Sequence, residues 1–166
     1  MKITRAIFSL LILAISFNSF GQATDSLPVY QRFPTVPPFS IMRYPDSTKF
    51  VKDDLKEKQP VLVMVFSPDC DHCQHATEDL LRNMDKFKKV QIVMGTPLAY
   101  NFIKPFYDKY ELSKYPNIFI GWDASYFLGT FYGVRNYPSL YLYDKKGKFV
   151  KGYEGSVSFA KIAEDL

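Results

Sequence analysis

A continuous apolar run, VLVMVF at residues 61–66, most constrains how this chain can fold. Its length and its β-branched content predict a strand that is buried on both faces, as in sheets covered by helices on both sides. The run leads through SPDCDHC into a helical pattern. The apolar positions that share one face of this predicted helix are Cys73, Ala76, Leu80, Leu81, Met84 and Phe87.

Strand-like and helix-like patterns alternate along the rest of the chain. Further strands are predicted over residues 90–94, 117–122, 139–143 and 149–153, with the turn DKKG between the last two. Further helices are predicted over residues 50–58, 98–112 and 124–132, and from a capping Ser156 to the C-terminus. This alternation predicts an α/β fold with a mostly parallel central sheet, an antiparallel C-terminal hairpin, and helices on both faces.

The N-terminal segment has the layout of a secretory signal peptide. Lys2 and Arg5 precede an apolar stretch at residues 6–20, and Ser19 and Gly21 stand at a small-x-small spacing. We expect cleavage after Gly21 and export to the periplasm or the extracellular space. The alternative is an uncleaved membrane anchor, but the stretch is short against the roughly 20 residues that a spanning helix needs.

The remaining chain is predicted to be an extended, proline-rich lead-in at residues 22–37 and one domain at residues 38–166. The whole chain carries a net charge of +4, and loss of residues 1–21 removes two basic residues and no acidic ones, which leaves +2. This balance argues against nucleic acid and an anionic membrane surface as partners. No later stretch is long and apolar enough to span a membrane, so no stable membrane insertion is expected after cleavage.

The only two cysteines, Cys70 and Cys73, stand three residues apart. Of the only two histidines, His72 lies between them and His75 follows Cys73 by two residues. A disulfide that closes so short a loop removes little entropy from the unfolded chain, so a structural disulfide is disfavoured. Structural zinc sites draw ligands from two separate segments, and no cysteine or histidine follows His75, so no metal site is expected. A redox pair is the interpretation that remains.

The predicted helix gives the two sulfurs different surroundings. Cys70 lies at the helix start, where free N–H groups and the helix dipole favour a thiolate, so we predict that Cys70 is the nucleophile. Cys73 begins the apolar face and is predicted to resolve the mixed disulfide. A protonated His72 would stabilise the thiolate, and Asp69 and Asp71 would oppose it. His72 and Asp71 are the candidates for redox tuning. No bound cofactor is expected, since the dithiol itself carries two electrons.

Two stretches, PVLVMVFSPDCDHC and YGVRNYPSLYLYDKKGKFVKGYEG, together resemble the active-site strand and the C-terminal half of the thioredoxin superfamily. The resemblance covers residues 38–166. It implies a cis peptide bond before Pro138, and it implies that Tyr137 and Pro138 bind substrate backbone. The signal and lead-in are similar to the TlpA/ResA-like group of exported redoxins, whose members mostly reduce disulfides. This implies disulfide-bearing protein substrates and a membrane electron donor or acceptor.

The chain departs from the thioredoxin pattern at positions that influence the chemistry. Met64 replaces a buried aspartate six residues before the first cysteine, so the proton acceptor for Cys73 is not identified. Asp69 replaces the usual tryptophan before that cysteine, and Asp71-His72 has the histidine of oxidising relatives without their proline. A reductase is predicted, with an oxidase or isomerase and a non-catalytic metal-binding protein as the alternatives.

Overall fold

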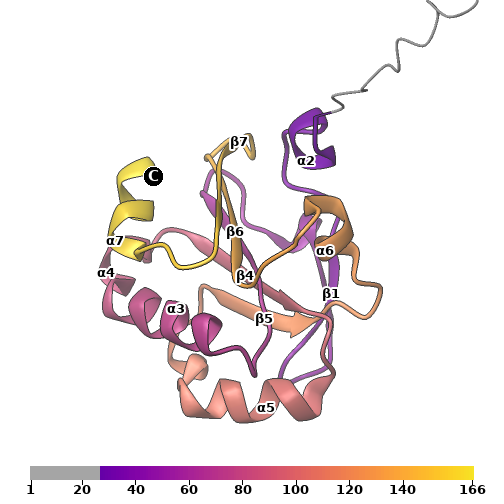
Figure 1. Cartoon of the computed structure of the whole chain (residues 1–166), viewed down its shortest axis with the longest axis vertical. Helices are drawn as coiled ribbons and strands as arrows, with labels where there is room; N and C mark the ends of the chain where they lie inside the picture. Colours follow the sequence, from indigo (N-terminus) through magenta and orange to yellow (C-terminus); the bar gives the residue numbers. More distant parts are fainter. Residues whose placement is uncertain (1–26) are drawn as a thin grey trace, which may run out of the picture.

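Seven strands form one sheet in the computed structural model, which describes residues 27–166 (Figure 1). The sheet order is β2-β1-β5-β4-β3-β6-β7. The strands are β1 (Ser40–Arg43), β2 (Lys49–Val51), β3 (Val61–Val65), β4 (Gln91–Thr96), β5 (Ile118–Trp122), β6 (Ser139–Tyr143) and β7 (Phe149–Glu154). The α-helices are α2 (Val29–Arg32), α3 (Asp71–Arg82), α4 (Met84–Phe87), α5 (Tyr100–Lys109), α6 (Phe127–Tyr132) and α7 (Phe159–Ile162).

The predicted α/β class is confirmed, and the parallel part of the sheet is its centre. Strand β4 pairs in parallel with β3 on one side and with β5 on the other. The predicted C-terminal hairpin is present, since β6 runs antiparallel to both β3 and β7. At the opposite edge, β1 runs antiparallel to β5 and to β2. This second antiparallel edge was not predicted from the sequence.

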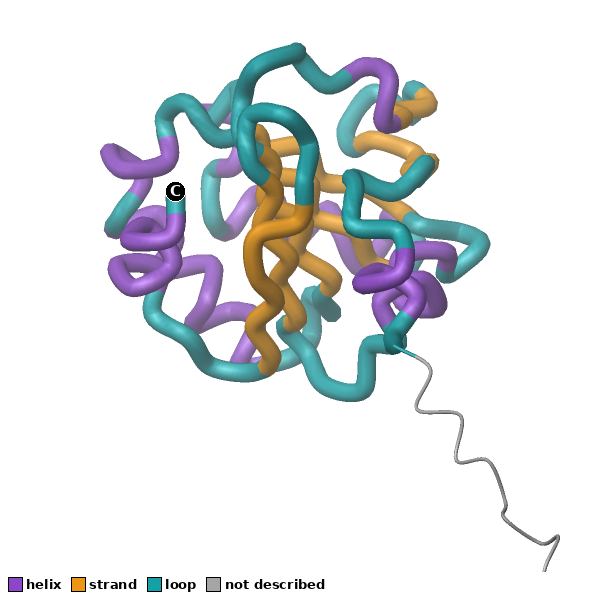
Figure 2. Tube along the Cα trace, turned by 90° about the horizontal axis from the view of Figure 1, so that it is seen from above, coloured by secondary structure: helices purple, strands orange, loops and turns teal. Residues whose placement is uncertain are grey.

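Strand β3 is buried on both faces, as its continuous apolar sequence predicts. Leu62 and Met64 belong to one hydrophobic core, and Val61, Val63 and Val65 belong to the core on the other face. Helices α3, α4, α5 and α7 pack on the first face, and α6 with α2 packs on the second (Figure 1), so the strands lie between helices in Figure 2. Full burial of each such side chain contributes roughly 1.5–3 kcal/mol.

The helix predicted over residues 50–58 is absent. The structure has strand β2 and then one 3-10 turn, η2 (Lys52–Asp54), at this place. Phe50 points into the core and stacks on Phe119 with ring centroids 4.4 Å apart. Its burial depends on pairing between β1 and β5, which lie far apart in the sequence. The local pattern of charges could not reveal that pairing, because the partner strand comes about 80 residues later in the chain.

The described part of the lead-in, residues 27–37, packs on the domain instead of standing free of it. It contains the helical turn α2, which differs from the extended segment predicted there. Tyr30 contacts Tyr141 and Phe149 at centroid distances of 5.2 and 5.3 Å. The predicted signal peptide and its cleavage site lie outside the described residues. Within residues 27–166, no helix has both the length and the apolar character that crossing a membrane requires.

The last helix begins later than the sequence indicated. Ser158, not the predicted Ser156, stands at the N-cap of α7, and its hydroxyl accepts a hydrogen bond from the N–H of Ala160 at 3.2 Å. Asp79 on α3 accepts a second hydrogen bond, from the N–H of Phe159 at 2.6 Å. These bonds satisfy N–H groups that a helix start leaves unpaired, and they fix α7 against α3.

Candidate active site

Cys70 is the N-cap residue of α3, directly after the loop that leaves β3. Its N–H donates to the carbonyl of Ser67 at 3.2 Å, and its own carbonyl accepts from the N–H groups of Cys73 and Gln74 at 3.0 Å each. These bonds fix the cysteine at the point where the strand loop becomes a helix. The Cys70 side chain is partly exposed, and its sulfur lies 3.9 Å from the carbonyl oxygen of Tyr137.

Cys73 lies one turn further along α3 and is fully buried, with 0% of its surface exposed. Burial raises the pKa of the Cys73 thiol well above its ordinary value, because desolvation penalises the thiolate. The nearby Cys70 and the Asp69 carboxylate raise this pKa further, and a backbone hydrogen bond from Ser67 acts in the opposite direction. The structure therefore brings together one accessible and one shielded thiol, as the apolar helix face predicts.

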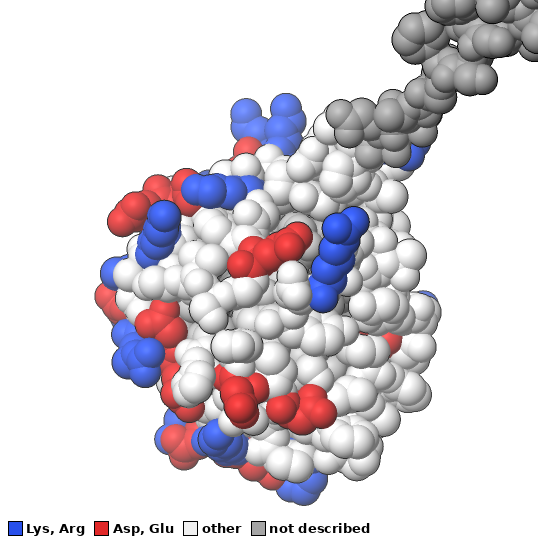
Figure 3. All heavy atoms as spheres, in the orientation of Figure 1, with Lys and Arg blue, Asp and Glu red and all other residues white. Residues whose placement is uncertain are grey.

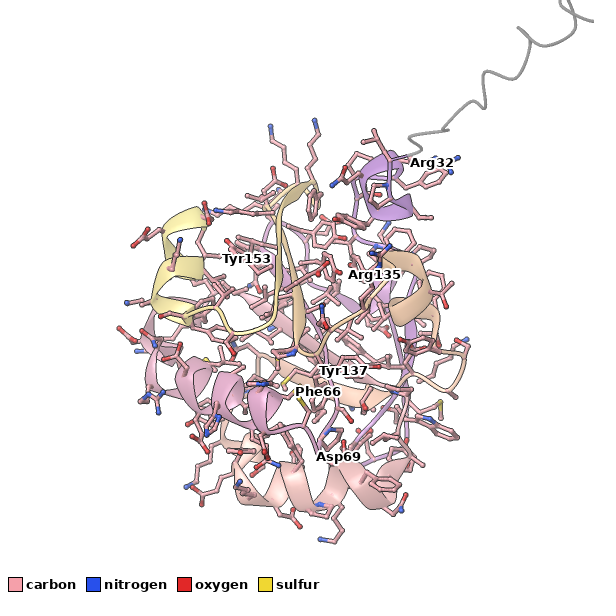
Figure 4. All side chains as sticks on the ribbon, in the orientation of Figure 1. Arg32, Phe66, Asp69, Arg135, Tyr137 and Tyr153 are labelled. Carbon is pink, nitrogen blue, oxygen red and sulfur yellow. The ribbon has the colours of Figure 1, made fainter. Side chains whose placement is uncertain are left out.

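The loop before β6 forms the second wall of the site. The Tyr137–Pro138 peptide bond is cis, as predicted, and Pro138 is buried at the start of β6. In Figure 4, the labelled Tyr137 and Phe66 lie near the middle of the view, and Asp69 lies below them, above α5. The Tyr137 hydroxyl donates to the hydroxyl of Tyr126 at 3.5 Å, and burial raises the pKa of the Tyr137 phenol. The sequence thus predicts which loop faces the cysteines.

A model of the thioredoxin-like domain family matches residues 51–166, well over half of the chain. The chain belongs to this thioredoxin-like family. The superfamily predicted from the two sequence stretches is therefore confirmed. A comparison with curated protein sequences finds no match.

Solved structures similar to this thioredoxin-like chain share its fold at low sequence identity. A thiol-disulfide oxidoreductase from Bacteroides fragilis has a TM-score of 0.64 and 18% identity, covering 80% of this chain and 99% of the other. A secreted Mycobacterium tuberculosis disulfide oxidoreductase, described as homologous to E. coli DsbE, has a TM-score of 0.64 and 18% identity, covering 77% and 93%. StoA from Bacillus subtilis has a TM-score of 0.59 and 17% identity, covering 80% and 98%.

The candidate tuning residues of the thioredoxin-like domain lie on its surface. Asp71 and His72 are exposed in the first turn of α3. His72 and His75 line a surface cavity of about 250 Å³ beside residues 156–158. Asp69 is also exposed, and its carboxylate accepts a hydrogen bond from the Ser67 hydroxyl. Among residues 27–166, no group of three or more His, Cys, Asp and Glu side chains is arranged to hold a metal ion.

The carboxylates near the cysteines in sequence have other partners. Glu78 accepts a hydrogen bond from the Tyr110 hydroxyl at 3.4 Å, and Asp79 caps α7 through Phe159. Met64, at the position where thioredoxins carry an aspartate, is fully buried. Asp69 is the one carboxylate among the groups that influence the Cys73 thiol. It is one of the two aspartates that the sequence predicted to oppose the Cys70 thiolate.

Asp123 and Tyr126 complete the site, and sequence reasoning missed both. Asp123 is 2% exposed, and its two carboxylate oxygens accept from the N–H groups of Phe127 at 3.0 Å and Leu128 at 2.8 Å. Tyr126 precedes α6 in the left-handed conformation, with φ of 52°. Its ring covers Gly129, where any Cβ would lie only 2.2 Å from the ring carbons. An aspartate just before a helical pattern is a capping signal that could have located this start.

Proposed function

We propose that this chain is an exported thiol–disulfide oxidoreductase that acts on protein disulfides through Cys70 and Cys73, with reduction as its physiological direction. The observation that carries this proposal is the unequal burial of two thiols one helical turn apart, with the exposed one facing the Tyr137–Pro138 loop. Disulfide exchange needs one accessible attacking thiol and one resolving thiol that the substrate cannot reach.

The reaction proceeds in two exchanges. The Cys70 thiolate attacks one sulfur of a substrate disulfide, the substrate S–S bond breaks, and the released substrate thiolate takes up a proton. The resulting mixed disulfide joins Cys70 to the substrate. Cys73 then loses its proton and attacks the Cys70 sulfur, which forms the Cys70–Cys73 disulfide and releases the second substrate thiolate for protonation. The substrate gains two electrons and two protons, and the enzyme dithiol loses them.

Tyr137 and Pro138 are proposed to hold the substrate beside Cys70. The carbonyl of Tyr137 lies 3.9 Å from the Cys70 sulfur, so a polypeptide bound at this loop would have its cysteine within reach of that sulfur. The half-buried ring of Tyr137, joined through its hydroxyl to Tyr126, would limit the width of the groove on that side. His72 and Asp71, exposed beside the pair, are proposed to tune its potential.

Export and the direction of electron flow rest on the sequence. The signal-peptide layout of residues 1–21 supports export, and the TlpA/ResA-like resemblance supports reduction. The enzyme would need no bound cofactor, because the dithiol stores the two electrons. In an exported compartment, a reductase would draw these electrons from a membrane protein, since cytoplasmic reductants do not reach that space.

The reduction potential of the Cys70–Cys73 pair tests the proposed direction. The mature protein is equilibrated with glutathione buffers of known ratio, and the dithiol fraction is measured after trapping. A value near that of thioredoxin, about −270 mV, supports a reductase. A value near that of DsbA, about −120 mV, would instead make the protein an oxidant that donates its disulfide. Turnover of a disulfide substrate should vanish in Cys70→Ser, and turnover that survives this change would contradict the proposed function.

A further inference from the structure

A cleft lies between the loop that precedes Cys70, which we call the active-site loop, and helix α5. Tyr137 is on the other side of this loop. The cleft has a volume of about 240 Å³. Its apolar lining comes from Pro68 in the active-site loop and from Phe102, Pro105 and Phe106 on α5. We call it the α5 groove. Phe106 is 3% exposed, whereas Phe102 is 45% exposed and leaves apolar surface open to solvent beside the groove.

The α5 groove is built into the same structure that holds Cys70. The side-chain amide of Gln74 donates to the carbonyl of Pro68 at 3.2 Å, and the Lys109 ammonium donates to the Gln74 side-chain oxygen at 2.8 Å. These two bonds connect the active-site loop, the first turns of α3 and the end of α5. Asp69, the residue directly before Cys70, also lines the groove. The groove therefore begins one residue from the proposed nucleophile.

A substrate polypeptide attached to Cys70 must pass between the Tyr137 loop and the Asp69 side of the site. In Figure 3, which has the orientation of Figure 4, the surface around Tyr137 is uncharged, with a basic side chain above it, where Figure 4 labels Arg135, and acidic side chains below it, toward Asp69. On the Asp69 side, the α5 groove offers apolar surface that is partly open to solvent. Its volume of about 240 Å³ is enough to take one large apolar side chain.

We propose that the α5 groove binds one aromatic or large aliphatic side chain of the disulfide-bearing polypeptide, a few residues from the cysteine that Cys70 attacks. This inference rests on the proposed function and adds a substrate preference to it. The preference arises because the side chain removes the exposed face of Phe102 from water. The groove enters neither exchange step, so small disulfides without a polypeptide gain nothing from it.

The test compares two sets of serine- and glycine-rich peptides, each with one cysteine joined to glutathione by a disulfide. One set has phenylalanine two to four residues from the cysteine on either side, and the other has serine at the same place. We expect kcat/KM about tenfold higher for the best phenylalanine peptide, the usual scale for one apolar contact. In Phe102→Ala, the ratio of kcat/KM between the phenylalanine and the serine peptides should fall to near one. The rates for the serine peptides and for glutathione disulfide should not change.

Two further variants serve as controls. Phe102→Leu keeps an apolar side chain in the groove and should keep most of the preference. Phe33→Ala removes an aromatic side chain that is 58% exposed beside α2, far from the cysteines, and should leave the preference intact. Thermal unfolding checks that each variant is folded, and because Phe102 is largely exposed, its midpoint should change little.

The proposal is overturned if no phenylalanine peptide is preferred, or if Phe102→Ala keeps the preference. Self-association of the wild type that Phe102→Ala abolishes would assign the groove to a second copy of the chain and would also overturn it. A wild-type protein that exchanges with none of the probes, glutathione disulfide included, would reject the proposed function itself, and the groove's role with it.

Discussion

At the residue scale, the backbone positions of Cys70 and Cys73 give two chemically identical side chains different exposure to solvent. Cys70 precedes the first helical turn and keeps contact with solvent, whereas Cys73 points into the core between α3 and the sheet. Burial favours the neutral thiol of Cys73, so in the proposed reaction this residue would attack only after its proton had been removed. In that reaction, the mixed disulfide at Cys70 would wait for deprotonation of Cys73.

This difference predicts selective alkylation of the reduced, folded protein. Iodoacetamide between pH 7 and 9 should label Cys70 and leave Cys73 unlabelled, because burial raises the pKa of Cys73 and thiolate would form there only at higher pH. Peptide mass spectrometry of the quenched protein locates the label. Denaturation before labelling should expose both cysteines equally. Rapid labelling of Cys73 in the folded protein would contradict the assigned roles.

His72 offers a second prediction at the same scale. A protonated His72 next to Cys70 favours the thiolate and hence the reduced form, so His72→Ala should make the pair more reducing, by on the order of 30 mV. His75→Ala is the matched control, since His75 is also exposed, one turn further along α3. Both potentials are measured against glutathione. Equal potentials for wild type and His72→Ala would remove His72 from the tuning residues.

At the element scale, α6 depends on a single buried carboxylate. Asp123 uses both oxygens to satisfy the N–H groups of Phe127 and Leu128. In Asp123→Asn, one oxygen becomes an NH₂ group that cannot accept, so one buried N–H loses its partner. We expect the free energy of unfolding to fall by about 1–3 kcal/mol, measured by urea denaturation. Ser125→Ala, which removes only a peripheral hydroxyl bonded to the same carboxylate at 3.3 Å, should change it by less than about 0.5 kcal/mol.

The elements that sequence analysis located are those whose signals are local. The run at residues 61–66 and the turn DKKG are complete within a few residues, so β3 and the β6–β7 hairpin follow from them. The β1–β2 hairpin escaped prediction because its burial comes from pairing with β5. The same reason explains which parts of the candidate site could be predicted. The cysteine spacing and Pro138 are local sequence signals, whereas the contact of Tyr137 with Tyr126 depends on how α6 packs.

At the scale of the whole molecule, the sheet separates two cores and places the chemistry at one end. The loops after β3 and before β6 meet there, since the two strands are antiparallel neighbours in register from Val61–Tyr143 to Val65–Ser139. The Cys70–Tyr137 contact is thus a consequence of the central pairing. Substitutions that disturb this pairing would affect stability and exchange together.

Export is a prediction about the whole chain. Protein recovered from the envelope or medium of an expressing bacterium should begin at Gln22, because the signal-peptide layout places the cut after Gly21. N-terminal sequencing and intact mass measure this directly. A cytoplasmic protein that keeps residues 1–21 would reject export, and an uncut protein in the membrane fraction would favour the anchor instead.

Trapping of the mixed disulfide tests the central claim, that Cys70 attacks and Cys73 resolves, most directly. Cys73→Ser and Cys70→Ser are each reduced, mixed with a disulfide-bearing peptide and analysed by non-reducing mass spectrometry. The account predicts a stable adduct on Cys70 in the Cys73→Ser protein and almost none on Cys73 in the Cys70→Ser protein, because the Cys73 sulfur is buried. An adduct of equal yield on Cys73, or no adduct on Cys70, would contradict it.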